Sequence, residues 1–118
     1  METTLANHTI KEETTSFLID RKARRLSPRT IDFYREKLYA FAKYCAERGV
    51  IYMEDISPRL LREYLILLGE SHNPGGVHTF YRTVRTFLNY FEEENDEELP
   101  NPIRKVHPPR VPNQPIVG

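Results

Sequence analysis

Two Ser-Pro pairs constrain the fold of this chain more than any other feature, because each marks the start of a helix. In Ser27-Pro28 and Ser57-Pro58 the serine oxygen can accept a hydrogen bond from a free backbone N–H group. Proline loses no hydrogen bond at the first helical position. Apolar residues recur at spacings of three and four, and no stretch alternates as a strand would. The sequence therefore predicts an all-α fold.

Four helical segments are predicted, over residues 10–25, 28–48, 58–68 and 77–94. Thr9 and Glu12 fit a capping box before the first segment, and Gly49 ends the second. The Asn-Pro-Gly-Gly stretch 73–76 is expected to form a turn before the fourth. The predicted inner faces comprise Phe17 and Leu18; Ile31, Tyr34, Leu38, Phe41 and Cys45; Leu60, Leu61, Tyr64, Leu65 and Leu68; and Val77, Phe80, Tyr81, Val84, Phe87, Leu88 and Phe91.

The composition changes after Leu99, where six of the nine prolines are found. Such a segment cannot continue a helix and is expected to be extended and semi-rigid. Arg104, Lys105 and Arg110 make it basic. The chain is therefore expected to comprise a disordered N-terminus over 1–8, a helical domain over 9–98 and a proline-rich basic linker over 99–118.

The net charge of zero hides an uneven distribution of charge. Residues 21–48 contain nine Lys and Arg against three acidic residues, whereas residues 92–98 contain six acidic residues and no basic ones. A polyanion responds to the local field rather than to the total, so the neutral sum does not exclude nucleic acid as a partner. The acidic run is expected to face away from such a partner.

Candidate nucleic-acid contacts lie at the starts of the second and fourth segments. Arg29, Phe33 and Lys37 stand four residues apart and form one stripe along the helix. Helix N-termini expose N–H groups that suit phosphates, and Gly75 and Gly76 would let the backbone approach one closely. The fourth segment adds His78, Thr79, Arg82 and Arg85. The alternatives are a solvated surface for the stripe and a plain flexible turn for the glycines.

The order of these motifs resembles the N-terminal core-binding domain of the tyrosine recombinases, the phage-integrase family, whose small helical fold is called SAM-like. The resemblance spans about residues 10–112 and rests on Phe17-Leu18, Leu26-Ser27-Pro28-Arg29-Thr30 with Tyr34, Leu38 and Phe41, Asp55-Ile56-Ser57-Pro58, Val84-Arg85-Thr86-Phe87-Leu88-Asn89-Tyr90-Phe91, and Asn101-Pro102-Ile103 with Pro108 and Pro109. It implies a bundle of four or five helices and an extended linker that leads to a C-terminal catalytic domain of the same polypeptide.

The resemblance implies DNA binding in site-specific recombination and integration. In this family the domain is half of a clamp around double-stranded DNA at the core recombination site, and its second and fourth helices approach the major groove. Arginine suits a guanine edge or a phosphate, and Phe33 suits a thymine methyl group. Other recombinase protomers on the DNA are expected partners, and the isolated domain is expected to be a monomer. The expected DNA-binding residues are Arg25, Ser27, Arg29, Thr30, Phe33, Lys37, Gly75, Gly76, His78, Thr79, Arg82, Arg85, Arg104, Lys105 and Arg110.

No catalytic residue, cofactor or metal is expected in this chain. In the family the tyrosine nucleophile and its basic partners come from the catalytic domain. His107-Pro108-Pro109-Arg110 spells the family's His-x-x-Arg pattern, but it lies in the proline-rich strap without a basic cluster. The histidines lack metal-ligand spacing. The lone Cys45, predicted to be buried, fits a reducing compartment, and no apolar run reaches the about 20 residues of a membrane span. A cytoplasmic, nucleoid-associated protein is expected.

Two other classes remain open. A small helical protein-interaction module would show an exposed apolar patch and no salt-dependent DNA binding. A regulator of the helix-turn-helix type would use one short recognition helix, with its partner helix directly before it. Two separate helices share the candidate contacts here, which favours the recombinase domain.

Overall fold

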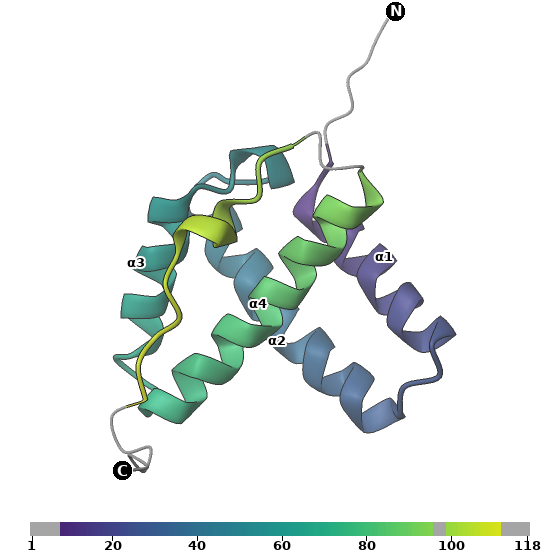
Figure 1. Ribbon diagram of the computed structural model, residues 1–118, viewed down its shortest axis with the longest axis horizontal. Helices are drawn as coiled ribbons and strands as arrows, with labels where there is room; N and C mark the ends of the chain where they lie inside the picture. The colour runs from purple at the N-terminus through teal and green to yellow at the C-terminus, as the bar shows by residue number, and fades with distance from the viewer. Residues whose placement is uncertain (1–7, 96–98, 112–118) are drawn as a thin grey trace, which may run out of the picture.

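The computed structural model describes residues 8–95 and 99–111 and is built from helices (Figure 1). The element order is α1 (Ile10–Ala23), α2 (Pro28–Glu47), the short 3₁₀ helix η1 (Met53–Asp55), α3 (Pro58–Leu68), α4 (Pro74–Glu94) and the 3₁₀ helix η2 (Pro102–Lys105). Within these residues the extended pairing is a single antiparallel bridge between Thr9 and Tyr52. The predicted all-α fold with a small four-helix bundle is confirmed.

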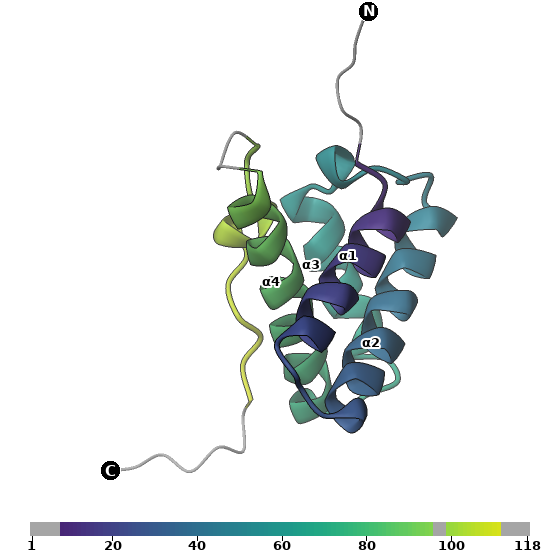
Figure 2. The same ribbon diagram turned by 90° about the vertical axis from the view of Figure 1, so that its right-hand side faces the viewer.

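The helices are arranged so that the beginnings of α2 and α4 lie at the same end of the molecule. Helices α1 and α2 lie side by side, and α4 packs against both of them (Figure 2). Helix α3 packs against α4 and η2 on the opposite side from α1. The C-terminal end of α4, where the acidic run begins, lies at the other end of the bundle. The acidic run therefore begins at the end of the bundle opposite to the one where α2 and α4 begin.

Side-chain caps begin each long helix. Thr9, Ser27, Ser57 and Asn73 each accept a hydrogen bond from the backbone N–H group three residues later, at 3.1, 3.2, 3.0 and 2.7 Å. These bonds confirm the Thr9 half of the capping box and both Ser-Pro starts. The expected start of the fourth helix at residue 77 is wrong, because the Asn73 cap starts α4 at Pro74. The 75–76 glycine pair therefore belongs to the first turn of α4 rather than to a turn before it.

The ends of the first two helices are set by residues with positive φ. Gly49 adopts a φ of 77° after α2, as its glycine predicts. Helix α1 ends at Ala23, before the expected residue 25, because Arg25 itself lies in the left-handed region with a φ of 65°. A non-glycine residue is uncommon there, and nothing in the sequence predicted it.

The core is aromatic and uses the predicted faces. Phe17, Phe41 and Phe87 are fully buried, and most of the predicted inner residues are buried with them. Tyr34, Leu65 and Phe80 are only partly buried and pack at the edge of this core. Cys45 is buried as predicted, and burial raises the pKa of its thiol to about 12. A thiol with such a pKa is a packing group rather than a nucleophile.

The C-terminal segment is bound to the bundle instead of leaving it directly. Residues 102–105 form a helical turn, not the extended chain expected there, because Ile103 and Val106 bury their side chains in the core. The Asn101 amide group donates to Glu92 at 3.0 Å, and Arg104 pairs with Glu92 at 2.8 Å. On the α3 side, Arg62 donates to the carbonyl of Lys105 at 2.8 Å. Residues 107–111 continue without helical structure, and residues 112–118 of the expected linker lie outside the described residues.

The beginning of the described chain is also bound. His8, expected within a disordered N-terminus, accepts a hydrogen bond from Met53 N at 2.7 Å through its carbonyl, and its backbone N–H group donates to Glu54 at 3.2 Å. Residues 1–7 of that terminus lie outside the described residues. No helix in the described part of the chain is long and apolar enough to cross a membrane. Nor do the His, Cys, Asp and Glu side chains in these ranges gather into a metal-binding group.

Two tyrosines in neighbouring positions of the core provide a matched test of packing. The Tyr44 hydroxyl donates to the carbonyl of Leu60 at 3.0 Å, whereas the buried Tyr64 hydroxyl has no partner among the described residues. We expect Tyr44→Phe to lower the free energy of unfolding by about 1 kcal/mol, and Tyr64→Phe to leave it unchanged or raise it by up to about 1 kcal/mol. Urea unfolding measures both, and a larger loss for Tyr64→Phe would contradict this account.

The docking of the C-terminal segment should weaken in acid. Hydrogen bonds from Asn101 and Arg104 hold the pKa of Glu92 below its ordinary value of 4.5. Its stabilising contribution is therefore complete above pH 4.5 and is lost as the pH falls through the lowered value. We expect the protection factor of the Val106 amide, which donates to Ile103 at 3.1 Å, to fall in acid once its rate is corrected for the intrinsic pH dependence of exchange. Glu92→Gln should show fast exchange already at neutral pH, and equal protection in both proteins would refute the role of Glu92.

Candidate nucleic-acid interface

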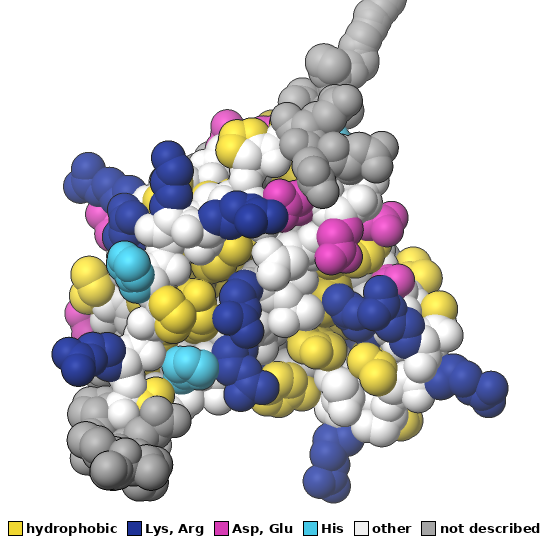
Figure 3. Space-filling model, in the orientation of Figure 1, with side chains coloured by type: hydrophobic (Ala, Val, Ile, Leu, Met, Phe, Trp, Pro, Cys, Tyr) yellow, Lys and Arg dark blue, Asp and Glu magenta, His cyan; other side chains and the backbone are white. Residues whose placement is uncertain are grey.

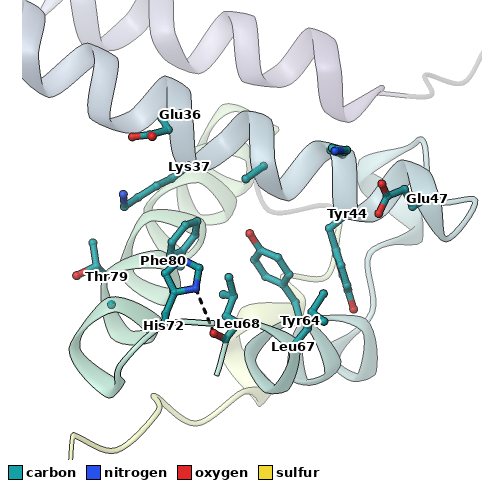
Figure 4. A pocket seen from close by; sticks show the side chains of 13 residues that line it. Glu36, Lys37, Tyr44, Glu47, Tyr64, Leu67, Leu68, His72, Thr79 and Phe80 are labelled. Atoms are coloured by element: carbon teal, nitrogen blue, oxygen red, sulfur yellow. Dashed lines mark hydrogen bonds between the residues drawn. The ribbon is translucent and has the colours of Figure 1, made fainter. Parts of the chain in front are cut away.

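A groove between α2, α3 and α4 brings together predicted residues from both candidate helices (Figure 4). This central groove has a volume of about 660 Å³. Of the predicted residues, Lys37 comes from α2, and Gly76 and Thr79 come from the first turns of α4. Its lining residues are Glu36, Lys37, Ala40, Lys43, Tyr44, Glu47, Tyr64, Leu67, Leu68, His72, Gly76, Thr79 and Phe80.

Lys37 has a defined position at the edge of the central groove. Its ammonium nitrogen lies 4.3 Å from the centre of the Phe33 ring and 4.8 Å from the centre of the Phe80 ring. Both distances are within the range of a cation–π interaction. Phe33 remains 39% exposed, so the aromatic residue of the predicted stripe does reach the surface. The stripe of the sequence is thus joined to α4 through Phe80.

The residues at the start of α2 divide into exposed cations and capping groups. Arg25 and Arg29 are exposed, in the turn before α2 and in its first turn. Ser27 and Thr30 are hydrogen-bonded to each other: the Ser27 side-chain oxygen accepts from the Thr30 backbone N–H group and lies 3.0 Å from the Thr30 hydroxyl. Their first role is therefore to start the helix, and the cations are left to face solvent.

The predicted residues of α4 lie on more than one side of that helix. Gly76 and Thr79 face the central groove, whereas Arg82 is exposed. The Arg85 guanidinium lies 5.6 Å from the Tyr81 ring, and the His78 ring is 5.9 Å from the same ring. Sequence spacing placed these residues at the start of one helix, but the structure distributes them around it.

A second hollow lies between α4 and the C-terminal segment. This side hollow, of about 460 Å³, contains Arg85 and Arg104 together with Glu92 and Glu93. Arg104 forms an ion pair with Glu92, which compensates part of the arginine charge. Lys105 and Arg110 are exposed on the same segment. None of these three cations of the linker lines the central groove.

Acidic and basic side chains are unevenly distributed on the surface of the protein. On the face shown in Figure 3, most acidic side chains gather toward the C-terminal end of α4, whereas Lys and Arg lie at the upper left, along α4 and toward the lower right. Helix N-termini carry partial positive charge, and those of α2 and α4 lie at this lower end. Some of the basic side chains therefore lie near these helix termini, and others lie on the α3 side of the bundle.

Several residues of the central groove were not predicted as functional. Phe80 was placed on the inner stripe of its helix, and Tyr64 on a core helix, because their spacing is apolar. In Figure 4 the Tyr64 hydroxyl points into the groove, and burial raises the pKa of this phenol, so that it stays a neutral donor. Lys43, Glu36 and Glu47 line the α2 side. The sequence signal that could have singled out Phe80 is an aromatic residue at the edge of an apolar stripe, where partial exposure is expected.

Comparison with known proteins identifies the architecture. No family model matches this sequence, and no curated protein matches it. One solved structure, the N-terminal domain of a phage integrase/site-specific recombinase from Haloarcula marismortui, superposes with a TM-score of 0.77 over 89% of this chain and 100% of that one, at 23% sequence identity. The fold is that of an integrase N-terminal domain. The expected fold is therefore confirmed, and the integrase-type fold positions the two candidate helices described above.

Two substitutions of Arg25 separate the cost of its left-handed backbone from the effect of its charge. A left-handed conformation costs a non-glycine residue roughly 1 kcal/mol, a cost that glycine does not bear. Arg25→Gly is expected to be more stable than Arg25→Ala by about 0.5 kcal/mol, although both remove the same cation. Thermal and urea unfolding of the two variants measure this difference. If Arg25→Ala were the more stable protein, the left-handed conformation would not be strained.

Proposed function

We propose that this chain is the core-site DNA-binding domain of a site-specific tyrosine recombinase of the phage-integrase family. The observation that supports this most strongly is an integrase-type fold in which α2 and α4 both begin along one edge of the bundle and share a central groove, lined by Lys37 of α2 and by Gly76 and Thr79 of α4. Duplex DNA would lie across these two ends. The domain would hold one side of the DNA as half of a clamp and would act in the cytoplasm, at the nucleoid.

The chemistry of this end suits a polyanion. Arg29 and Arg82 are exposed, and Lys37 reaches the edge of the central groove. Their charges add to the positive ends of the two helix dipoles, while the acidic end of α4 is at the opposite end of the bundle. Backbone N–H groups in the first turns of α2 and α4 can contact phosphates there. Arg29 and Phe33 would meet base edges in the major groove.

The C-terminal segment would lead to the catalytic domain. Residues 102–106 are attached to α3 and α4, so the direction in which the chain continues is set by the bundle. Lys105 and Arg110 would then follow the DNA backbone toward a catalytic domain of the same polypeptide on the other side of the duplex. In this division residues 9–98 bind DNA, residues 99–118 link the domains, and the catalytic residues lie outside this chain.

A second candidate function, contact with another protein, is favoured by an apolar groove between α1 and α2. This outer groove, of about 550 Å³, is lined by Ile10, Val50 and Ile51 together with Tyr39, which is 56% exposed. Such a groove suits a protein partner, and a neighbouring recombinase protomer on the same DNA would be one. It lies on the α1–α2 side of the bundle, across α2 from the central groove, and Lys43 lines both grooves.

Two arginines in the same local motif provide the test. Arg29 and Arg59 each follow a Ser-Pro cap and are exposed, but Arg29 lies on α2, whereas Arg59 lies on α3 and pairs with Glu63 at 3.0 Å. We expect Arg29→Ala to weaken binding to a short duplex about fivefold and to reduce the slope of log K against log salt by about 1. Arg59→Ala should change neither quantity. Fluorescence anisotropy at several salt concentrations measures both.

The location of binding is tested by NMR titration of the labelled domain with the same duplex. Shifts should concentrate in residues 25–37 and 75–85 and should fade as salt is added. Equal effects of the two arginine variants would show that binding is non-specific attraction to a basic surface. If no shifts occur at low salt, or if they follow the outer groove only when a protein partner is added, the protein-interaction function is the correct one.

A further inference from the structure

Lys37 is held by aromatic rings from two different helices. Phe33 lies one turn before it on α2, and Phe80 lies in the second turn of α4. The ammonium group is 4.3 Å from the centre of the first ring and 4.8 Å from the centre of the second. A single ring on the same helix would leave the lysine free to turn away. A second ring on another helix restricts it to the position where α2 and α4 come together.

We propose that Phe80 is a positioning residue for DNA binding, because it holds the Lys37 ammonium group ready for a phosphate of the duplex backbone. This inference rests on the proposed function and adds to it a residue that does not itself carry charge. A free lysine loses considerable side-chain entropy when it is fixed on a phosphate. Lys37 has lost part of that freedom in the unbound protein, so that less is lost on binding.

The charge of Lys37 remains available in this arrangement. Aromatic rings attract a cation through their quadrupole and do not neutralise it. In the described part of the chain, Lys37 forms no ion pair with a carboxylate, although Glu36 is its neighbour. Arg35, by contrast, pairs with Asp32, and Arg104 pairs with Glu92. The cation at the helix crossing is thus oriented without being compensated.

Phe80 also connects the two helices that are proposed to contact DNA. Its ring packs at the edge of the core, 6.4 Å from the ring of Tyr64 and 5.0 Å from that of His72. These contacts fix the ring before any ligand is present. The phosphate bound by Lys37 would therefore lie in a fixed position relative to both helices. Since a phosphate carries no sequence information, the contribution of this pair should be the same for duplexes of different sequence.

A double-mutant cycle tests the proposal. We expect Lys37→Met to weaken duplex binding about tenfold and to reduce the salt slope by about 1. Phe80→Leu, which keeps an apolar side chain, should weaken binding about threefold in the wild-type background and leave it unchanged in the Lys37→Met background. The same factors are expected with two duplexes of unrelated sequence. If Phe80→Leu has the same effect in both backgrounds, or no effect in the wild type, the proposal is wrong.

A measurement without DNA accompanies the cycle. Protons next to the Lys37 nitrogen lie over two rings, so their NMR signals should be shifted upfield in the free protein and should return toward ordinary positions in Phe80→Leu. Unshifted signals in the wild type would overturn the arrangement itself. If the wild type binds no duplex, the proposed function fails and this inference fails with it. If the Arg29→Ala effect is present but the Phe80–Lys37 coupling is absent, only this inference fails.

Discussion

Phe17 holds together three of the four long helices, and the arrangement of the rest depends on it. Phe17 belongs to α1, and its side chain is completely buried. The centre of its ring lies 5.2 Å from that of Tyr34 on α2, and 5.7 and 5.4 Å from those of Phe87 and Tyr90 on α4, edge to face in each case. Edge-to-face contacts between aromatic rings stabilise beyond the area they bury and favour specific angles. One ring therefore fixes both the distance and the orientation of α2 and α4 against α1.

The orientation fixed at this ring decides what the surface can do. Because α2 and α4 cross, they begin at opposite corners of the same lower edge, so the positive ends of two helix dipoles lie along that edge. The net charge of the chain is zero, yet the charge is uneven, since Glu92, Glu93 and Glu94 lie together at the C-terminal end of α4. The central groove and the position of Lys37 between Phe33 and Phe80 are further consequences of the same crossing.

The C-terminal segment shows how a proline-rich stretch can still belong to the folded unit. Its prolines prevent a long helix, but Ile103 and Val106 add to the core, and Glu92 binds both Asn101 and Arg104. An extended linker beginning at residue 99 would be free to change its direction relative to the bundle. The docked segment instead continues from a defined point beside α3 and α4.

The sequence by itself determined the all-α class, the helix starts at the two Ser-Pro pairs, the apolar faces and the burial of Cys45. These features depend on caps and on spacing within one segment, which are local. Only the tertiary structure decided that Gly76 and Thr79 face the central groove while Arg85 faces the side hollow, that residues 102–106 dock, and that Phe80 meets Lys37. Each of these depends on the crossing of elements far apart in sequence, which helical periodicity does not specify.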